Sequence, residues 1–451
     1  MRLRSLIWMG ASVMLTLASC YQESRLLVHA DFVVTVENDN HTAPVHVALE
    51  NTSTGADFYE WTFEGGSPAT SSEKTPKEVA YKQAGSYKVM LKAWNDHEQD
   101  TKEYTLRVDS AVTVSFGTEI EMNDFAPAKV RITNQTRGAS TFVWTFEGGQ
   151  PEESDEPQPG EIAFDKPGEH RITVMASNGG ETFTLSKSIT LRPALQPDFD
   201  IEPTFDDFDY EVPFTASLAN KTVSGLTYRW ETTGGTLDDA TAEHPRLSIT
   251  TPGTYTVTLT AENGKESKEV RKEVTVKANS NLYTMRDVKF GIKSAAGSIG
   301  AFYSLDKRMI IPQPSKGVSG EIGKEISLVF FGINFSFEKC YFTSPDRATD
   351  AGFYAIPNAT KTYIVNTLEQ SPLTFSASDF DAMVDDTPLK GLDIKTNDNP
   401  SGWFIANPVP RVVLFETSDG RRGAIKIKAF VSEQSQSYIL TDLKFQKRQG
   451  Q

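Results

Sequence analysis

The stretch Tyr59-Glu60-Trp61-Thr62-Phe63-Glu64-Gly65-Gly66 decides the fold, because the chain repeats it twice. The later copies are Phe142-Val143-Trp144-Thr145-Phe146-Glu147-Gly148-Gly149 and Tyr228-Arg229-Trp230-Glu231-Thr232-Thr233-Gly234-Gly235. Aromatic and polar residues alternate up to a glycine turn, which is typical of a strand with one buried face. The pattern therefore predicts three similar β units in series.

The same companion residues accompany each copy at matching distances. An asparagine with Ser or Thr two places on lies ten residues before each tryptophan, at Asn51, Asn134 and Asn220. A glycine turn and an alternating strand follow each tryptophan, and each strand closes on an asparagine, at Asn95, Asn178 and Asn263. We therefore expect three β-sandwiches with Trp61, Trp144 and Trp230 as core anchors, and the repeat explains the Asn-x-Ser/Thr triplets better than glycosylation does.

These units resemble PKD domains, an Ig-like family with a Trp-x-Phe-Gly-Asp-Gly turn and a Pro-Gly-x-Tyr-x-Val-x-Leu strand. The turn here reads Glu-Gly-Gly, and His170 replaces the tyrosine in the second copy, so no role of the family's aspartate is carried over. The resemblance implies domains at 31–108, 109–193 and 194–278 that act as spacers or interaction modules. At about 3.3 Å per strand residue, three such sandwiches end to end would hold the last domain ~100 Å from Cys20.

The first twenty residues have the pattern of a targeting signal. Arg2 and Arg4 precede an apolar run that is too short to span a bilayer permanently. Leu17-Ala18-Ser19-Cys20 resembles the bacterial lipobox, which implies a signal peptide at 1–19, an acylated Cys20, and an anchor and linker at 20–30. The implied location is extracytoplasmic, on the outer membrane and facing the cell surface; the alternative is an ordinary secretory signal with an incidental cysteine.

The chain has two cysteines, Cys20 and Cys340. If Cys20 carries lipid, Cys340 has no partner thiol and the chain cannot form an internal disulfide. Cys340 lies in an apolar run. We expect it to be a small buried hydrophobe and not a nucleophile.

Residues 280–451 leave the repeat and form a separate C-terminal β domain. Segments rich in β-branched and aromatic residues predict strands at 287–293, 325–342, 411–417, 423–431 and 438–446. Thr417–Arg421 predicts a hairpin turn, and Ser378–Val384 predicts a short helix capped by Ser376 or Ser378. The whole chain is therefore predicted to be all-β.

Several kinds of chemistry are excluded. The net charge of −15 argues against nucleic acid, whose phosphates need clustered cations. All six histidines precede residue 280, so a nucleophile in the last domain lacks the usual base, and we predict no enzyme. A carboxylate pair for glycoside cleavage is the alternative, but helix capping and solvation explain the acidic cluster of Asp379, Asp381, Asp385 and Asp386.

Neither a cofactor nor a metal ion is expected. The acidic runs Glu152–Glu156 and Asp206–Asp209 offer the oxygen ligands that calcium prefers, but they lack defined ligand spacing. Charge runs of this kind are usually solvated.

Binding is the function that remains for the last domain. Trp403 lies in the polar stretch Asn397–Phe404, where indole could stack on a sugar ring while Asn399 and Asp398 take its hydroxyls. Phe404 would extend this surface. The alternative, which we favour for these aromatics, is that Trp403 and Phe404 plug the core. Weaker candidates are Tyr303, Tyr341, Phe353 and Tyr354.

The order of lipid anchor, serial Ig-like modules and a separate β domain resembles surface glycan-binding lipoproteins of SusC/SusD-type uptake systems. That resemblance implies polysaccharide as ligand and a TonB-dependent transporter complex as partner. A second possibility is a structural or adhesive protein with protein partners. The third is a haem scavenger, because the closing hairpins, 415–440, resemble those of HmuY-like lipoproteins, whose iron-holding histidines this domain lacks.

Overall fold

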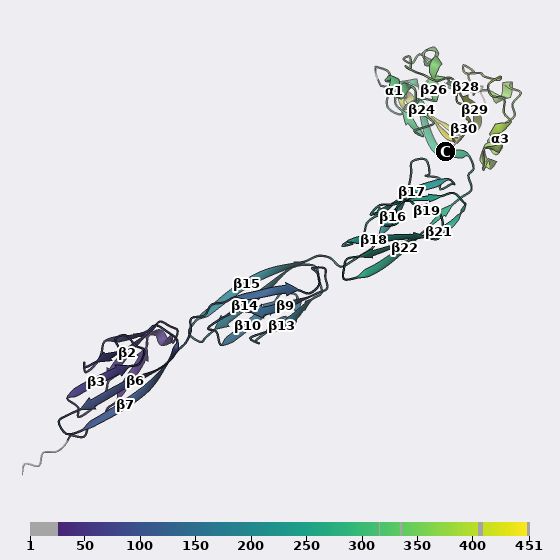
Figure 1. The fold of residues 1–451 in the computed structure, drawn as a ribbon. Helices are drawn as coiled ribbons and strands as arrows, with labels where there is room; N and C mark the ends of the chain where they lie inside the picture. The colour runs from purple at the N-terminus through teal and green to yellow at the C-terminus, as the bar shows by residue number, and fades with distance from the viewer. Residues whose placement is uncertain (1–25, 315, 334–335, 405–408, 449–451) are drawn as a thin grey trace, which may run out of the picture. The chain divides into compact units, whose positions relative to one another are not determined.

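The computed structural model describes residues 26–314, 316–333, 336–404 and 409–448. Cys20 and the rest of the predicted signal lie outside this range. The chain forms two compact units, divided between residues 195 and 196. Both units consist mainly of antiparallel strands, which confirms the predicted all-β class (Figure 1).

The first sandwich packs a sheet of order β1-β2-β5 against a sheet of order β4-β3-β6-β7. Its strands are β1 (Phe32–Val36), β2 (Val45–Asn51), β3 (Phe58–Phe63), β4 (Thr70–Ser71), β5 (Glu78–Tyr81), β6 (Gly85–Trp94) and β7 (Gln99–Val108), and η1 (Glu37–Asp39) follows β1. Alternate apolar side chains of both sheets meet in one core.

The second and third sandwiches repeat this plan. The second has sheets β11-β13-β9-β8 and β12-β10-β14-β15, and the third has sheets β16-β17-β20-β19 and β18-β21-β22. The second comprises β8 (Phe116–Ile120), β9 (Ala128–Asn134), β10 (Thr141–Phe146), β11 (Gly149–Gln150), β12 (Glu153–Ser154), β13 (Gly160–Phe164), β14 (Gly168–Ser177) and β15 (Thr182–Leu191). The third comprises β16 (Phe199–Pro203), β17 (Phe214–Asn220), β18 (Thr227–Thr232), β19 (Thr236–Leu237), β20 (Arg246–Ile249), β21 (Gly253–Glu262) and β22 (Ser267–Val276).

The repeated tryptophans lie at the centre of the three cores. Trp61, Trp144 and Trp230 are each at most 2% exposed. Each indole Nε1 donates to the backbone carbonyl twelve residues later, at 3.0, 3.1 and 2.9 Å in turn. A phenylalanine from the first strand of each sandwich meets the indole edge to face at 5.0–5.3 Å. Their role as core anchors is the one that the repeat predicts.

The repeated asparagines close turns. The Oδ1 atoms of Asn51, Asn134 and Asn220 each accept the N–H two residues on at 2.9 Å. The Oδ1 atoms of Asn95, Asn178 and Asn263 accept the N–H groups two and three residues on, at 2.8–3.0 Å. These Asx turns explain why asparagine recurs at both positions.

The C-terminal domain has a five-stranded sheet of order β23-β31-β30-β29-β28 and a four-stranded sheet of order β25-β24-β26-β27. The strands are β23 (Leu282–Gly291), β24 (Phe302–Ser304), β25 (Met309–Ile311), β26 (Leu328–Ile333), β27 (Ser336–Thr343), β28 (Thr362–Val365), β29 (Arg411–Thr417), β30 (Arg422–Val431) and β31 (Tyr438–Gln446). The helices are α1 (Gly320–Gly323), α2 (Ala377–Ala382) and α3 (Thr387–Lys390), with 3-10 turns η2 (Lys293–Ala295), η3 (Pro345–Ala351), η4 (Leu368–Gln370) and η5 (Gln434–Gln436).

The five-stranded sheet is buried on both faces at β29. On β29, Val413 and Phe415 point into a core shared with the four-stranded sheet, whereas Val412 and Leu414 pack against α2 and α3. A strand that is covered on both sides reads as a continuous apolar run, which is why β29 was easy to predict. The hairpin before β30 and the short helix capped by Ser376 are also confirmed.

Candidate functional site

The segment Asn397–Phe404 ties together the edges of the two sheets in the C-terminal domain. The N–H of Asn399 donates to the carbonyl of Ile364 in β28 at 2.6 Å. The N–H of Phe404 donates to the carbonyl of Cys340 in β27 at 2.9 Å. The segment is therefore held at both ends by backbone hydrogen bonds.

Asp398 and Asn399, which we predicted to be sugar ligands, make this attachment. Asp398 Oδ1 accepts the N–H of Ile364 at 2.7 Å, and burial raises the pKa of this carboxyl. Asn399 Nδ2 donates to Thr367 Oγ1 at 2.8 Å, and its carbonyl accepts from Asn366 Nδ2 at 2.9 Å. Asp398 Oδ1 and Asn399 Nδ2 are therefore engaged within the fold.

Trp403 and Phe404 have opposite surroundings. Phe404 is 1% exposed, its ring lies 5.1 Å from that of Phe337, and the Arg411 guanidinium lies over it at 4.6 Å. Trp403 is 48% exposed. Phe404 is thus a core residue, as the packing alternative predicted, and the prediction that it belongs to the binding surface is wrong. Trp403 is not a core residue, so for this side chain the packing alternative is wrong.

Trp403 extends a row of aromatic rings, which we call the aromatic platform (Trp403, Tyr341 and Phe331). The Trp403 and Tyr341 rings lie 6.0 Å apart at 36°, and those of Tyr341 and Phe331 lie 5.0 Å apart at 40°. Tyr341 is buried, and burial raises the pKa of its phenol. The exposed indole therefore packs next to the buried ring of Tyr341, which in turn packs on the partly buried ring of Phe331.

A polar rim borders the platform. Arg347 Nη2 donates to Ser401 Oγ at 3.1 Å, and Arg347 Nε donates to Asp350 Oδ2 at 2.8 Å. Arg347 and Asp350 belong to η3, more than 50 residues before Trp403. Neither residue was predicted from the sequence, because no local pattern links η3 to the segment Asn397–Phe404.

The weaker aromatic candidates also divide into buried core residues and exposed residues. Tyr303 is fully buried and Phe353 is 6% exposed, so both are core residues. Tyr354 is 56% exposed. Of these predicted candidates, Tyr341 is the one whose ring packs next to Trp403.

The nucleophile and carboxylate candidates have structural partners. Burial raises the pKa of Cys340 to about 12, so its thiol stays protonated, as expected of a core residue. Asp379 forms the capping box of α2, and Asp381 pairs with Lys426 at 2.7 Å. Asp385 accepts the N–H of Thr387 at 2.8 Å, and Asp386 accepts from Asn281 Nδ2 at 2.6 Å.

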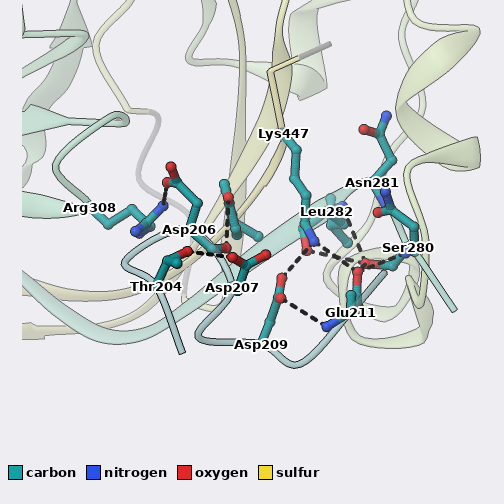
Figure 2. A network of polar contacts seen from close by, with 12 residues as sticks. Thr204, Asp206, Asp207, Asp209, Glu211, Ser280, Asn281, Leu282, Arg308 and Lys447 are labelled. Carbon is teal, nitrogen blue, oxygen red and sulfur yellow. Dashed lines mark hydrogen bonds and ion pairs between the residues drawn. The ribbon is translucent and has the colours of Figure 1, made fainter. Parts of the chain in front are cut away.

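The acidic loop after β16 joins the third sandwich to the C-terminal domain (Figure 2). Lys447 Nζ lies 2.7 Å from Asp209 Oδ2 and 3.0 Å from Glu211 Oε2. Glu211 Oε2 also accepts from the N–H and the Oγ of Ser280, both at 2.8 Å. Lys447 is 5% exposed, so this is a nearly buried ion cluster.

Arg308 holds the other side of the same loop. Its Nη1 pairs with Asp206 Oδ1 at 2.9 Å, and its Nη2 donates to the carbonyl of Phe205. The guanidinium lies 3.5 Å from the ring of Phe205, and Phe208 stacks on Tyr283 at 5.5 Å. We call this set of contacts the domain joint.

The joint accounts for the acidic cluster that offered calcium ligands in the sequence. Asp206 and Asp209 pair with cations of the C-terminal domain. Across the parts of the chain that the structure describes, no set of three or more His, Cys, Asp or Glu side chains is arranged to hold a metal ion.

A polar recess of about 650 Å³ lies beside the joint, lined by residues that include Arg421, Arg422 and Arg448. Arg421 pairs with Asp306 and Asp419, Arg422 with Glu416, and Arg448 with Asp306. These charges are balanced within the fold, so the recess presents little net field to an anion.

Comparison with known proteins found one family match and several similar solved structures. The PKD domain family matches residues 31–108 and 202–276. Three titin domains, I67–I69, align over 56% of this chain and 99% of that chain, with 11% identity and a TM-score of 0.30. Chicken CNTN1 FN1-FN3 domains align over 54% and 97%, with 11% identity and a TM-score of 0.22. No curated protein matches the sequence.

The chain is thus a tandem array of Ig-like sandwiches, two of which match the PKD family, followed by a mostly-β domain. Tandem modules of this kind are typical of extracellular surface proteins. Among the described residues, no helix has the length and apolarity needed to cross a bilayer.

Proposed function

We propose that this chain is a cell-surface lipoprotein of the outer membrane that captures glycan without cleaving it. Acylated Cys20 anchors the chain, the sandwiches serve as spacers, and the C-terminal domain binds the polysaccharide. The exposed Trp403 on the aromatic platform is the observation that carries this proposal. The recipient that we propose for the glycan is a TonB-dependent transporter.

The platform has the chemistry that sugar recognition needs. The apolar face of a pyranose ring stacks on indole, and the aromatic rings behind Trp403 fix its orientation at little entropic cost. Arg347 offers N–H donors and Asp350 offers acceptor oxygens for hydroxyl groups. A flat ring with both kinds of polar group beside it suits a neutral sugar better than an anion.

Affinity electrophoresis of the chain from residue 21 onward, through gels that contain single polysaccharides, tests the proposal. At least one polysaccharide should retard the chain, and Trp403→Ala should abolish the retardation. Phe183→Ala removes a similarly exposed ring (48%) from the second sandwich and should change nothing. Migration unaltered by every polysaccharide in a broad panel would favour the adhesive alternative with protein partners.

The anchor is tested separately by labelling cells with a palmitate analogue. The label should appear on the chain and disappear in Cys20→Ser. An unlabelled chain that still binds polysaccharide would contradict the anchor and leave the binding site standing.

A further inference from the structure

Exposed apolar side chains gather at the N-terminal end of the first sandwich. Leu26 is 67% exposed, Leu27 is 75% exposed and Phe58 is 51% exposed. The ring of Phe58 stacks on that of Trp94 at 5.8 Å and 25°. We call these four residues the N-terminal patch.

Backbone contacts show that the four residues belong to one end of the sandwich. Asn95 Nδ2 donates to the carbonyls of Leu26, at 3.0 Å, and Gly55, at 2.9 Å. The N–H next to Phe58, that of Asp57, donates to the carbonyl of Trp94 at 3.0 Å. The carbonyl of Leu27 lies so close to Gly55 that a Cβ there would meet it at 2.3 Å.

The fold itself does not require these aromatics. Phe58 and Trp94 are cross-strand partners, and the matching partners are Thr141 with Ser177 in the second sandwich and Thr227 with Glu262 in the third. The repeat therefore supplies two internal controls in which the same register position is polar.

The corresponding end of the second sandwich contacts the first sandwich, so its contacts show how this end packs against a neighbouring domain. Asn178, the counterpart of Asn95, donates from Nδ2 to the Ser110 carbonyl at 3.0 Å and to Thr42 Oγ1 of the first sandwich at 2.8 Å. That junction is polar. The corresponding end of the first sandwich carries apolar side chains, so we expect it to contact an apolar surface and not another polar domain end.

The short distance to Cys20 identifies that neighbour. Six residue steps separate Cys20 from Leu26, which even when fully extended span at most about 22 Å. Given the acylated Cys20 of the proposed function, on which this inference rests, the patch must stay close to the bilayer. Tryptophan, phenylalanine and leucine are the side chains that enter the interfacial layer of a membrane.

We propose that the N-terminal patch contacts the lipid surface, so that the first sandwich rests on the bilayer beside its anchor. Exposed Asp57 and Asp96 flank the patch, and Lys92 lies over the Trp94 ring at 5.4 Å. Because the flanking carboxylates repel anionic headgroups, the contact is made by apolar insertion and favours zwitterionic lipid.

A lipid-coupled chain provides the test. The chain from Cys20 onward is joined through its Cys20 thiol to a maleimide lipid in phosphatidylcholine vesicles, since the buried Cys340 does not compete. Brominated acyl chains should then quench part of the tryptophan emission. The quenching should be lost in Trp94→Phe and retained in Trp403→Phe, the control at the exposed tryptophan of the C-terminal domain.

Two outcomes would overturn the inference: equal emission with plain and brominated lipid, or quenching that survives Trp94→Phe. Adding phosphatidylglycerol should leave the quenching the same or lower it. Because the coupling is chemical, the result does not depend on acylation in the cell. A missing natural acyl group would contradict the proposed anchor while this measurement still reports on the patch.

Discussion

Among single residues, His170 shows that a different residue type can make the same contact at one position of the repeat. Tyr87 donates its hydroxyl to the carbonyl of Gln83 at 2.9 Å, and Tyr255 donates to that of Thr251 at 2.7 Å. His170 Nε2 lies 2.8 Å from the carbonyl of Lys166, which is also four residues earlier. The ring ties the long strand to the turn before it in all three sandwiches.

His170→Phe should therefore weaken the second sandwich, while His170→Tyr should be tolerated. Phenylalanine keeps the ring but cannot donate to the Lys166 carbonyl, a loss of about 1 kcal/mol in the free energy of unfolding. Hydrogen exchange of the amides in β14 measures the change locally. Equal protection in the Phe and Tyr variants would show that the bond does not stabilise the strand.

Asp398 predicts a pH dependence of stability. Burial raises the pKa of its carboxyl above the ordinary value of 3.8, so charging this group destabilises the native state. Its contribution to stability is full below pH 3.8 and is lost as the pH rises through the raised native pKa. Asp398→Asn keeps an acceptor for the Ile364 N–H and removes the charge.

The melting temperature of Asp398→Asn should therefore equal or exceed that of the wild type at pH 7, and this advantage should vanish in acid. Asp393→Asn is the matched control, since exposed Asp393 accepts the N–H of Thr396 at 3.2 Å. A large loss of stability in Asp398→Asn at pH 7 alone would mean that the charge is favourable.

At the element scale, the domain joint makes the loop after β16 and the end of β31 depend on each other. Lys447→Met leaves the nearly buried carboxylates of Asp209 and Glu211 without their cation, which should cost about 3 kcal/mol, the lower end of the range for fully buried pairs. Calorimetry of the full chain should show the transition that contains the C-terminal domain moving to lower temperature. Trp403 lies elsewhere in that domain, so polysaccharide binding below the transition should persist.

Lys324→Met serves as the control for this prediction. Lys324 forms an exposed pair with Glu321 beside α1, and such surface pairs are worth about 0–1 kcal/mol. Equal, small effects of both substitutions would show that the joint contributes no more than a surface contact.

Local periodicity made most elements of this chain predictable. The alternation around Trp61 and the continuous apolar run of β29 are both local patterns, so these strands and their buried faces follow from neighbouring residues. The exposure of Trp403 was not predictable, because it depends on how Asp398 and Asn399 fasten the loop to distant strands. The Lys447–Glu211 pair, 236 residues apart, has no local signal at all.

In the molecule as a whole, two separate surfaces carry the two proposed contacts, one with lipid and one with glycan. The N-terminal patch provides apolar side chains near the proposed anchor, and the aromatic platform presents one indole with a polar rim. The sandwiches between them have tryptophans sealed in their cores. Substitutions at the two surfaces should therefore act independently, with Phe58→Thr leaving polysaccharide binding intact and Trp403→Ala leaving the vesicle quenching intact.

Hydroxyl-radical footprinting of the full chain, with and without a polysaccharide that retards it, locates the glycan-binding surface. We predict that the ligand protects Trp403 from oxidation while Phe183 and Tyr354 stay as reactive as before. Protection of other surfaces with Trp403 unchanged would contradict the assignment of the binding site to the aromatic platform.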